Sequence, residues 1–277
     1  MTGTTPKIIT FTIVTNTILY ISFLILDLLP ENSVPFSPYI ASTCLKYTSI
    51  IICFIAGLYI SRKNRSIMPA LPLALTLFAD TFLLLLDSYY VIGTTAFAIV
   101  QTIYGIYLIK QHISIDNQLH QKSHHHNIAT ISITTRIILY IVILIAIWQI
   151  NTIDTLIIVS IWSYVNLILN TIHSLILTAI IITNFKSNTK SKAHSQTFYP
   201  NYHKHISLFF TGLLLFLACD TCVGLSNLGS YTDGIPAGNI LSVISYLMWV
   251  FYLPSQEIIV YSFSHINRTN DNKQSIP

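Results

Sequence analysis

Long apolar stretches recur from one end of this chain to the other. Hydrophobic residues make up 53% of its 277 residues, and charged residues make up only 9%. Many stretches reach about 20 residues, which is the length that a helix needs to cross a ~30 Å hydrocarbon layer. In lipid, a helix also satisfies all of its own backbone hydrogen bonds. The sequence therefore predicts an all-α polytopic membrane protein.

We expect eight transmembrane helices in a single integral membrane domain that covers residues 1–277. The predicted spans are residues 8–29, 39–60, 67–89, 91–110, 133–150, 153–184, 205–226 and 237–262. The sixth stretch is too long for one upright helix and too short for two. We therefore interpret it as one helix that continues past the membrane toward Lys186.

The positions of the basic residues predict the orientation of the chain. All but one of the 14 Lys and Arg residues fall at the amino terminus, at the loops that follow even-numbered spans, or in the carboxyl tail. The opposite loops carry Glu31, Asp154 and Asp233 instead. Because Lys and Arg accumulate on the cytoplasmic side of membrane proteins, we expect both termini to be cytoplasmic.

Lys46 is the exception, because it falls within the second predicted span. One interpretation is that its aliphatic stem lies in lipid while the ammonium group reaches the nearer membrane surface. The other is that the side chain faces the helix bundle and meets a carboxylate or a phosphate. The sequence leaves both interpretations open.

Two short segments of similar sequence each place an aspartate inside an apolar stretch. They are Leu75-Thr-Leu-Phe-Ala-Asp80-Thr81 and Leu215-Phe-Leu-Ala-Cys-Asp220-Thr221. A carboxylate in hydrocarbon costs several kcal/mol, so an intramembrane aspartate is by default a candidate functional residue. Because the segments fall in the third and seventh spans, a parallel repeat of two four-helix units is one interpretation.

Two carboxyl groups that share a low-dielectric site are suited to general acid and base chemistry. Both cannot ionise easily, so one keeps its proton at neutral pH while the other can act as a base. The alternative is that each aspartate only hydrogen-bonds a neighbouring helix. Intramembrane aspartyl proteases also use two aspartates, but this chain lacks the glycine that their pattern places before one of them. We therefore set proteolysis aside.

The predicted depths place further polar residues near the aspartates. With a rise of ~1.5 Å per residue, Lys46, Asp80 and Asp220 come to roughly 9 to 14 Å below the outer membrane boundary. Gln101 and Tyr164 come only a little deeper. We expect a polar layer in the outer half of the bundle.

Four short motifs fall in the second, third, sixth and seventh spans. They are Leu45-Lys46-Tyr47, Leu77-Phe-Ala-Asp80, Tyr164-Val-Asn166 and Gly212-Leu-Leu-Leu-Phe216-Leu-Ala-Cys-Asp220. Through these motifs most of the chain resembles the YhhN family of eight-helix membrane proteins, which includes lysoplasmalogenases. The chain differs where the family usually shows Gly-His-x-x-Tyr, because it reads Val100-Gln101-Thr-Ile-Tyr104 there.

The resemblance implies hydrolysis of the vinyl-ether bond of a lysoplasmalogen, a lysophospholipid, to a fatty aldehyde and a glycerophospho-alcohol. An acid protonates the enol-ether carbon, and water captures the oxocarbenium-like product. Asp80 and Asp220 would be the acid and the water-activating base, in an order that the sequence leaves open. The candidate substrate-binding residues are Lys46, Gln101, Tyr104, Tyr164 and Asn166. We expect no cofactor or metal.

The competing hypothesis is a lipid-binding protein or a proton-coupled transporter in which Asp80, Asp220, Lys46 and Asn166 form a polar path. The substrate or cargo would reach this path from the surrounding membrane lipids. Nothing in the distribution of basic and aromatic residues indicates a nucleic acid partner.

Two groups of polar residues have simpler interpretations. Asn166, Asn170 and His173 share a helical face, and we favour hydrogen bonding between helices over a cavity lining. His112 and the run that begins at His124 fall in a predicted cytoplasmic loop, where we expect solvated side chains rather than a metal site.

Overall fold

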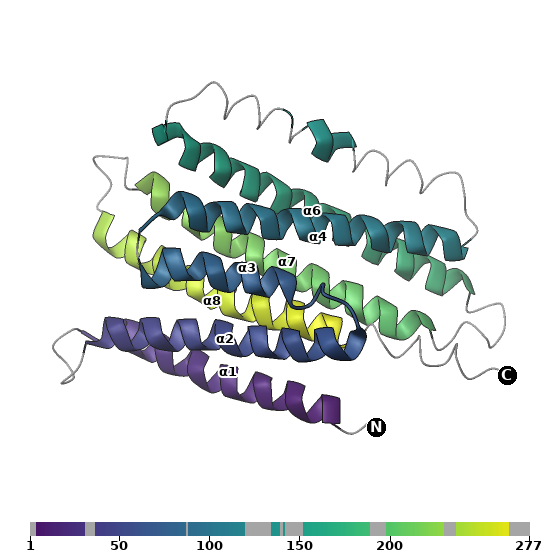
Figure 1. Cartoon of the computed structure of the whole chain (residues 1–277), viewed down its shortest axis with the longest axis horizontal. Helices are drawn as coiled ribbons and strands as arrows, with labels where there is room; N and C mark the ends of the chain where they lie inside the picture. The colour runs from purple at the N-terminus through teal and green to yellow at the C-terminus, as the bar shows by residue number, and fades with distance from the viewer. Residues whose placement is uncertain are drawn as a thin grey trace. The chain divides into compact units, whose positions relative to one another are not determined.

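The regular secondary structure of the described residues is entirely helical, as the sequence predicts (Figure 1). The computed structural model describes residues 4–30, 37–86, 88–119, 134–138, 141, 152–188, 198–229 and 237–265. The helices are α1 (Thr4–Leu28), α2 (Pro38–Asn64), α3 (Leu71–Asp80), a π-helix η1 (Thr81–Leu85), α4 (Tyr90–Leu119), α6 (Thr152–Asn188), α7 (Phe198–Gly229) and α8 (Ala237–Phe263).

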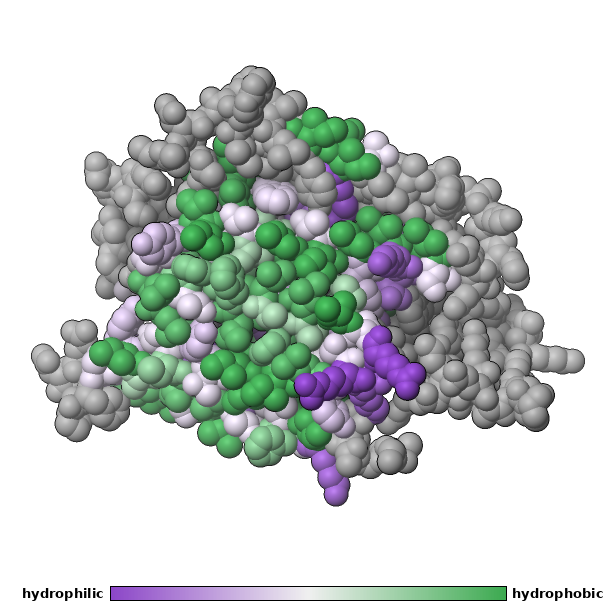
Figure 2. Space-filling view, viewed as in Figure 1, coloured by the Kyte–Doolittle hydropathy of each residue, from purple (hydrophilic) through white to green (hydrophobic). Residues whose placement is uncertain are grey.

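Six of these helices are long and apolar enough to cross a membrane. Their apolar segments are Lys7–Leu28, Pro38–Asn64, Tyr90–Ser114, Ile157–Ile180, Lys204–Val223 and Ser242–Phe263. Large apolar side chains on them are exposed, for example Phe11 and Ile40. Figure 2 shows that hydrophobic residues cover most of the described part of one face. Exposed apolar surface of this extent suits contact with lipid rather than water, and it indicates a multi-pass membrane protein.

The third predicted span, residues 67–89, is shorter in the structure. The helical segment runs only from Leu71 to Leu85. On its amino-terminal side, Arg65 follows the end of α2 in a left-handed conformation with φ 48°, and a turn precedes α3. On the other side, Tyr89 adopts φ 55° before α4 begins. At ~1.5 Å per residue, such a helix covers only about three quarters of the hydrocarbon layer.

Two other predicted spans have different outcomes. Most of the fifth, residues 133–150, lies outside the described residues; residues 134–138 and 141 are described and are helical. The sixth is confirmed as one continuous helix, because α6 extends from Thr152 to Asn188.

The described residues form two compact units. Unit 1 consists of Met1–Leu73 and Leu208–Pro277, and it contains α1, α2, α8 and most of α7. In this unit α1 and α2 lie side by side as a hairpin and both contact α8 (Figure 1). Helix α7 approaches α8 at Gly212, where a Cβ atom would lie 3.2 Å from the backbone oxygen of Ser255. The absence of a side chain allows this close approach.

Unit 2 consists of Ala74–Ser207, and its largest helix contact is between α4 and α6. The π-helix packs on α4 at Gly93, where a Cβ atom would lie 2.5 Å from Leu83 Cγ. The core of this unit includes the fully buried side chains of Tyr104, Leu108 and Leu167.

Candidate functional sites

Asp80 lies in unit 2 at the point where the α-helical pattern changes to a π-helix. It is the last residue of α3 and is only 4% exposed. The backbone N–H of Leu86 donates to the Thr81 carbonyl at 2.9 Å, a bond that spans five residues. The Thr81 hydroxyl donates to the Leu77 carbonyl, also at 2.9 Å. Single π-helical turns are rare and are frequently found at functional sites.

Asp220 lies in unit 1, on α7, and is half-buried. The neighbouring Cys219 is buried, and Phe216, one turn earlier, packs its ring against Tyr252 of α8 at 6.0 Å between centroids. Both predicted catalytic aspartates therefore lie in apolar helices. Because Asp80 and Asp220 belong to different units, their action as a pair stays a prediction.

Lys46 forms an ion pair with Asp27 inside unit 1. Its Nζ atom lies 2.8 Å from Asp27 Oδ2 and donates to Oδ1 at 3.0 Å. The Ser42 hydroxyl donates to the same Oδ1 atom at 2.5 Å. The side chains of Lys46 and Asp27 are only 10% and 17% exposed. Of the two interpretations of Lys46, the structure shows the one in which the side chain is buried and meets a carboxylate.

Two aromatic rings complete the surroundings of Lys46. Its Nζ atom lies 4.8 Å from the ring centroid of Trp249 and 5.6 Å from that of Phe23. A cation over an aromatic face is stabilised by the ring quadrupole, by about 2 kcal/mol or more when it is desolvated. The buried ammonium group is thus stabilised by α1, through Asp27 and Phe23, and by α8, through Trp249.

Gln101 and Asn170 join α4 to α6 in unit 2. The Asn170 side-chain amide donates to the main-chain oxygen of Gln101 at 2.7 Å and to its Oε1 atom at 3.2 Å. One turn further along α6, His173 contacts His112 of α4 with 3.0 Å between ring nitrogens. The predicted role of Asn170 and His173 in joining helices is confirmed. His112 was predicted in a loop, but it is buried in α4, because that helix continues to Leu119.

The other predicted substrate-binding residues differ in their burial. Asn166 is buried and donates to the Trp162 carbonyl of its own helix at 2.9 Å. Tyr104 is fully buried on α4, whereas Tyr164 on α6 is 36% exposed. Among the predicted substrate-binding residues, Gln101 thus has Asn170 as its hydrogen-bond partner, and the sequence did not predict this pair.

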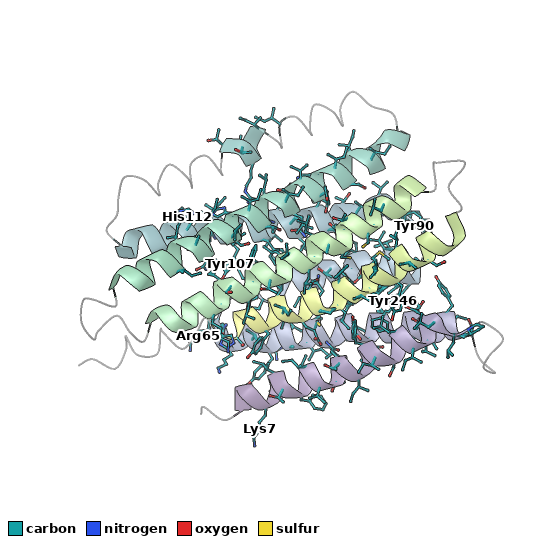
Figure 3. The ribbon with its side chains drawn as sticks, turned by 180° about the vertical axis from the view of Figure 1, so that it is seen from behind. Lys7, Arg65, Tyr90, Tyr107, His112 and Tyr246 are labelled. Carbon is teal, nitrogen blue, oxygen red and sulfur yellow. The ribbon has the colours of Figure 1, made fainter. Side chains whose placement is uncertain are left out.

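Arg136 is a buried residue of unit 2 that the sequence did not single out as a site residue. It is 4% exposed, and its Nη1 atom lies so close to Gly105 that a Cβ atom there would be 1.9 Å from it. The same Cβ atom would be 3.0 Å from Asn170 Oδ1. Five buried polar residues of α4, α6 and the segment around residue 136 form what we call the α4–α6 polar cluster. Its members are Gln101, His112, Arg136, Asn170 and His173. Figure 3 labels His112, which projects from α4.

Metal-ligating residues are dispersed in the part of the chain that the structure describes. No three His, Cys, Asp or Glu residues among those described lie together in a way that could hold a metal ion. The cysteines at 44, 53, 219 and 222 are all free thiols. The described residues thus offer carboxylates, imidazoles and one buried guanidinium, which suit proton transfer and charge binding.

No protein-family model matches this chain, and no curated protein or solved structure matches it. The resemblance to the YhhN family therefore stays a prediction from the sequence motifs.

Proposed function

We propose that this protein is a YhhN-like membrane hydrolase that cleaves the vinyl-ether bond of a lysoplasmalogen, with Asp80 and Asp220 as the acid and base. The observation that carries the proposal is the burial of the Asp80 side chain beside a π-helical turn in an apolar helix. An ionisable residue inside a membrane helix bundle is by default a candidate functional residue. The motif around Asp220 supplies the second carboxyl group.

The reaction needs one proton donor and one proton acceptor. A carboxylic acid transfers its proton to the vinyl carbon farther from the ether oxygen, which leaves an oxocarbenium ion. The second carboxylate removes a proton from a water molecule as this water adds to the carbon bonded to oxygen. In the resulting hemiacetal, the hydroxyl group loses its proton as the bond between this carbon and the glycerol oxygen breaks, and the glycerol oxygen takes up a proton, which gives the fatty aldehyde and the glycerophospho-alcohol.

Lys46 is the proposed contact for the headgroup phosphate, and its ion pair adds a condition. The ammonium group has three N–H donors, and both oxygens of Asp27 lie within hydrogen-bonding distance of it. A phosphate group would have to share the ammonium group with Asp27 or replace this carboxylate. We therefore expect Lys46→Met to raise the Michaelis constant and also to affect stability.

A second candidate function is lipid binding or proton-coupled transport without hydrolysis. The observation that favours it is the α4–α6 polar cluster, which buries Arg136 and two histidines inside unit 2. Ionisable residues inside membrane bundles often mark proton and ion pathways. This cluster is not needed for the proposed acid and base chemistry.

Liposomes that contain the purified protein and a lysoplasmalogen distinguish the two functions. If the protein is a hydrolase, fatty aldehyde accumulates, and the matched lysolipid with a saturated ether bond is not cleaved because it has no double bond to protonate. Movement of either lipid between leaflets without aldehyde would reject the hydrolase and favour the second candidate.

A further inference from the structure

A proline inside α8 removes one hydrogen bond from that helix. Pro254 has no N–H group, so it cannot donate to the carbonyl of Val250, four residues earlier. The Tyr20 hydroxyl of α1 donates to this carbonyl instead, at 3.1 Å. Membrane helices tolerate proline where a neighbouring group satisfies the freed carbonyl. The contact between Tyr20 and Val250 therefore replaces the bond that Pro254 removes.

The two parts of α8 on either side of this proline differ in packing. Before it, residues 242–251 are exposed or half-buried. After it, most of residues 255–263 are buried. Proline is also the commonest place for a helix to kink, because a backbone bond is missing there. The amino-terminal part of α8 can therefore move while the rest of the helix stays packed.

The amino-terminal part of α8 covers Lys46. Trp249 immediately precedes Val250, and its ring centroid lies 4.8 Å from Lys46 Nζ. The same ring packs against Phe23 of α1, with 6.1 Å between centroids. The Phe23 ring in turn contacts Tyr20 at 5.4 Å. The Tyr20 hydrogen bond therefore holds the residue next to the ring that covers the ammonium group.

We propose that the amino-terminal part of α8 is a gate over Lys46, which bends at Pro254 and is held closed by the Tyr20 hydroxyl. Opening moves the Trp249 ring away from the ammonium group and lets an anionic phosphate group approach it. This role in substrate entry rests on the proposed function, in which Lys46 binds the headgroup phosphate of a lysophospholipid. The bend and its hydrogen bond do not depend on that function.

Acetylation of lysine measures how often the gate opens. The protein in detergent reacts with the N-hydroxysuccinimide ester of acetic acid at fixed pH, and mass spectrometry of its peptides gives the rate at Lys46. Tyr20→Phe removes the hydroxyl but keeps the ring. It should raise the Lys46 rate about fivefold, the change in an equilibrium that the loss of one hydrogen bond gives.

The controls for this measurement lie in the same unit. Tyr39→Phe is the matched variant, because Tyr39 is an exposed tyrosine on α2, and it should leave the Lys46 rate unchanged. The exposed Lys7 should react at one rate in all variants. Equal Lys46 rates in the wild-type protein and Tyr20→Phe would overturn the gate.

The proline gives a second test. In Pro254→Ala the helix regains an N–H group that can donate to the Val250 carbonyl. Tyr20→Phe should therefore change the Lys46 rate little in this background. A rise that is as large in the Pro254→Ala background as in the wild-type protein would overturn the hinge, because the hydroxyl would then not replace the missing bond.

A lysophospholipid with a saturated ether bond tests whether the gate admits the phosphate group. This lipid is not cleaved, so the result does not depend on hydrolysis. We expect it to slow the acetylation of Lys46, whereas the alkylglycerol that lacks the phosphate should not. Equal slowing by both lipids, or slowing by neither, would overturn the role in phosphate entry, while aldehyde release from a lysoplasmalogen would still decide the hydrolysis itself.

Discussion

At the scale of single residues, the charges of Lys46 and Asp27 inside the apolar helices of unit 1 are held by specific partners. Asp27 meets both Lys46 and Ser42, and two aromatic rings cover the ammonium group. Isolated charges in hydrocarbon are costly, so the pair is tolerated because each group satisfies the other. Both members of the pair are therefore needed together.

The ion pair predicts a double-mutant result. Asp27→Asn leaves the Lys46 ammonium group buried without a counter-charge and should destabilise unit 1 by about 3 kcal/mol. The double variant Asp27→Asn/Lys46→Met should recover most of this loss. Thermal unfolding in detergent measures both, with Lys7→Met, an exposed lysine on α1, as the control. Losses that simply add in the double variant would contradict a direct interaction.

The amide contact between α4 and α6 predicts a smaller effect. Asn170→Leu removes both hydrogen bonds to Gln101, so unit 2 should lose about 1 kcal/mol of stability, a typical value for polar contacts between membrane helices. Ile172→Leu is the control, because Ile172 is an exposed residue of the same helix. The thermal unfolding midpoints of the two variants give the comparison, and equal midpoints would contradict a stabilising role for Asn170.

At the scale of helices, close approach depends on glycine. At Gly212 an added Cβ atom would lie 2.6 Å from a side-chain carbon of Ile259 and 3.2 Å from its backbone nitrogen. Backbone atoms cannot move aside as a flexible side chain can. The packing of α7 on α8 therefore requires a residue without a side chain at this position.

We expect Gly212→Ala to destabilise unit 1 by about 1–3 kcal/mol, because the two helices must separate to admit the methyl group. The control is Leu214→Ala, on the exposed face of α7. A lower unfolding midpoint for Gly212→Ala than for Leu214→Ala is the expected result. A raised midpoint in Gly212→Ala, as a better helix former would give, would contradict the close contact.

The helices themselves could be predicted better than their contacts. The apolar stretches were enough to predict that the chain is helical and that α6 is a single long helix, because both properties depend on local composition. The third span came out shorter because the turn after Arg65 and the positive φ of Tyr89 cut the apolar stretch at both ends. The partners of Lys46 and Gln101 were missed because hydropathy gives the depth of a residue but not which distant residue it meets.

At the scale of the whole molecule, six helices of the described part of the chain are long and apolar enough to cross a membrane, and the basic residues predict the orientation of the protein. Lys7, at the start of α1, and Arg65, after the end of α2, lie at the same end of unit 1 (Figure 3). This common basic end is what a cytoplasmic face of unit 1 requires. We therefore propose that the amino terminus is cytoplasmic, and the carboxyl tail with it.

Cysteine labelling tests this orientation. In a background with the 4 native cysteines replaced by serine, Asp233→Cys should react with an impermeant maleimide added outside cells, whereas Ser66→Cys should react only after permeabilisation. Asp233→Cys that is labelled only from the cytoplasmic side would contradict the predicted orientation.

The central claim is that Asp80 and Asp220 carry out vinyl-ether hydrolysis, and aldehyde release by their asparagine variants tests it most directly. Asparagine keeps the size of the side chain but can neither donate an acidic proton to carbon nor accept one from water. Asp80→Asn and Asp220→Asn should each lower the rate by more than about 100-fold, and the double variant should be scarcely slower than either. Asp154→Asn, in the first turn of α6, should keep the wild-type rate. A wild-type rate of aldehyde release by Asp80→Asn would contradict the proposed catalytic role.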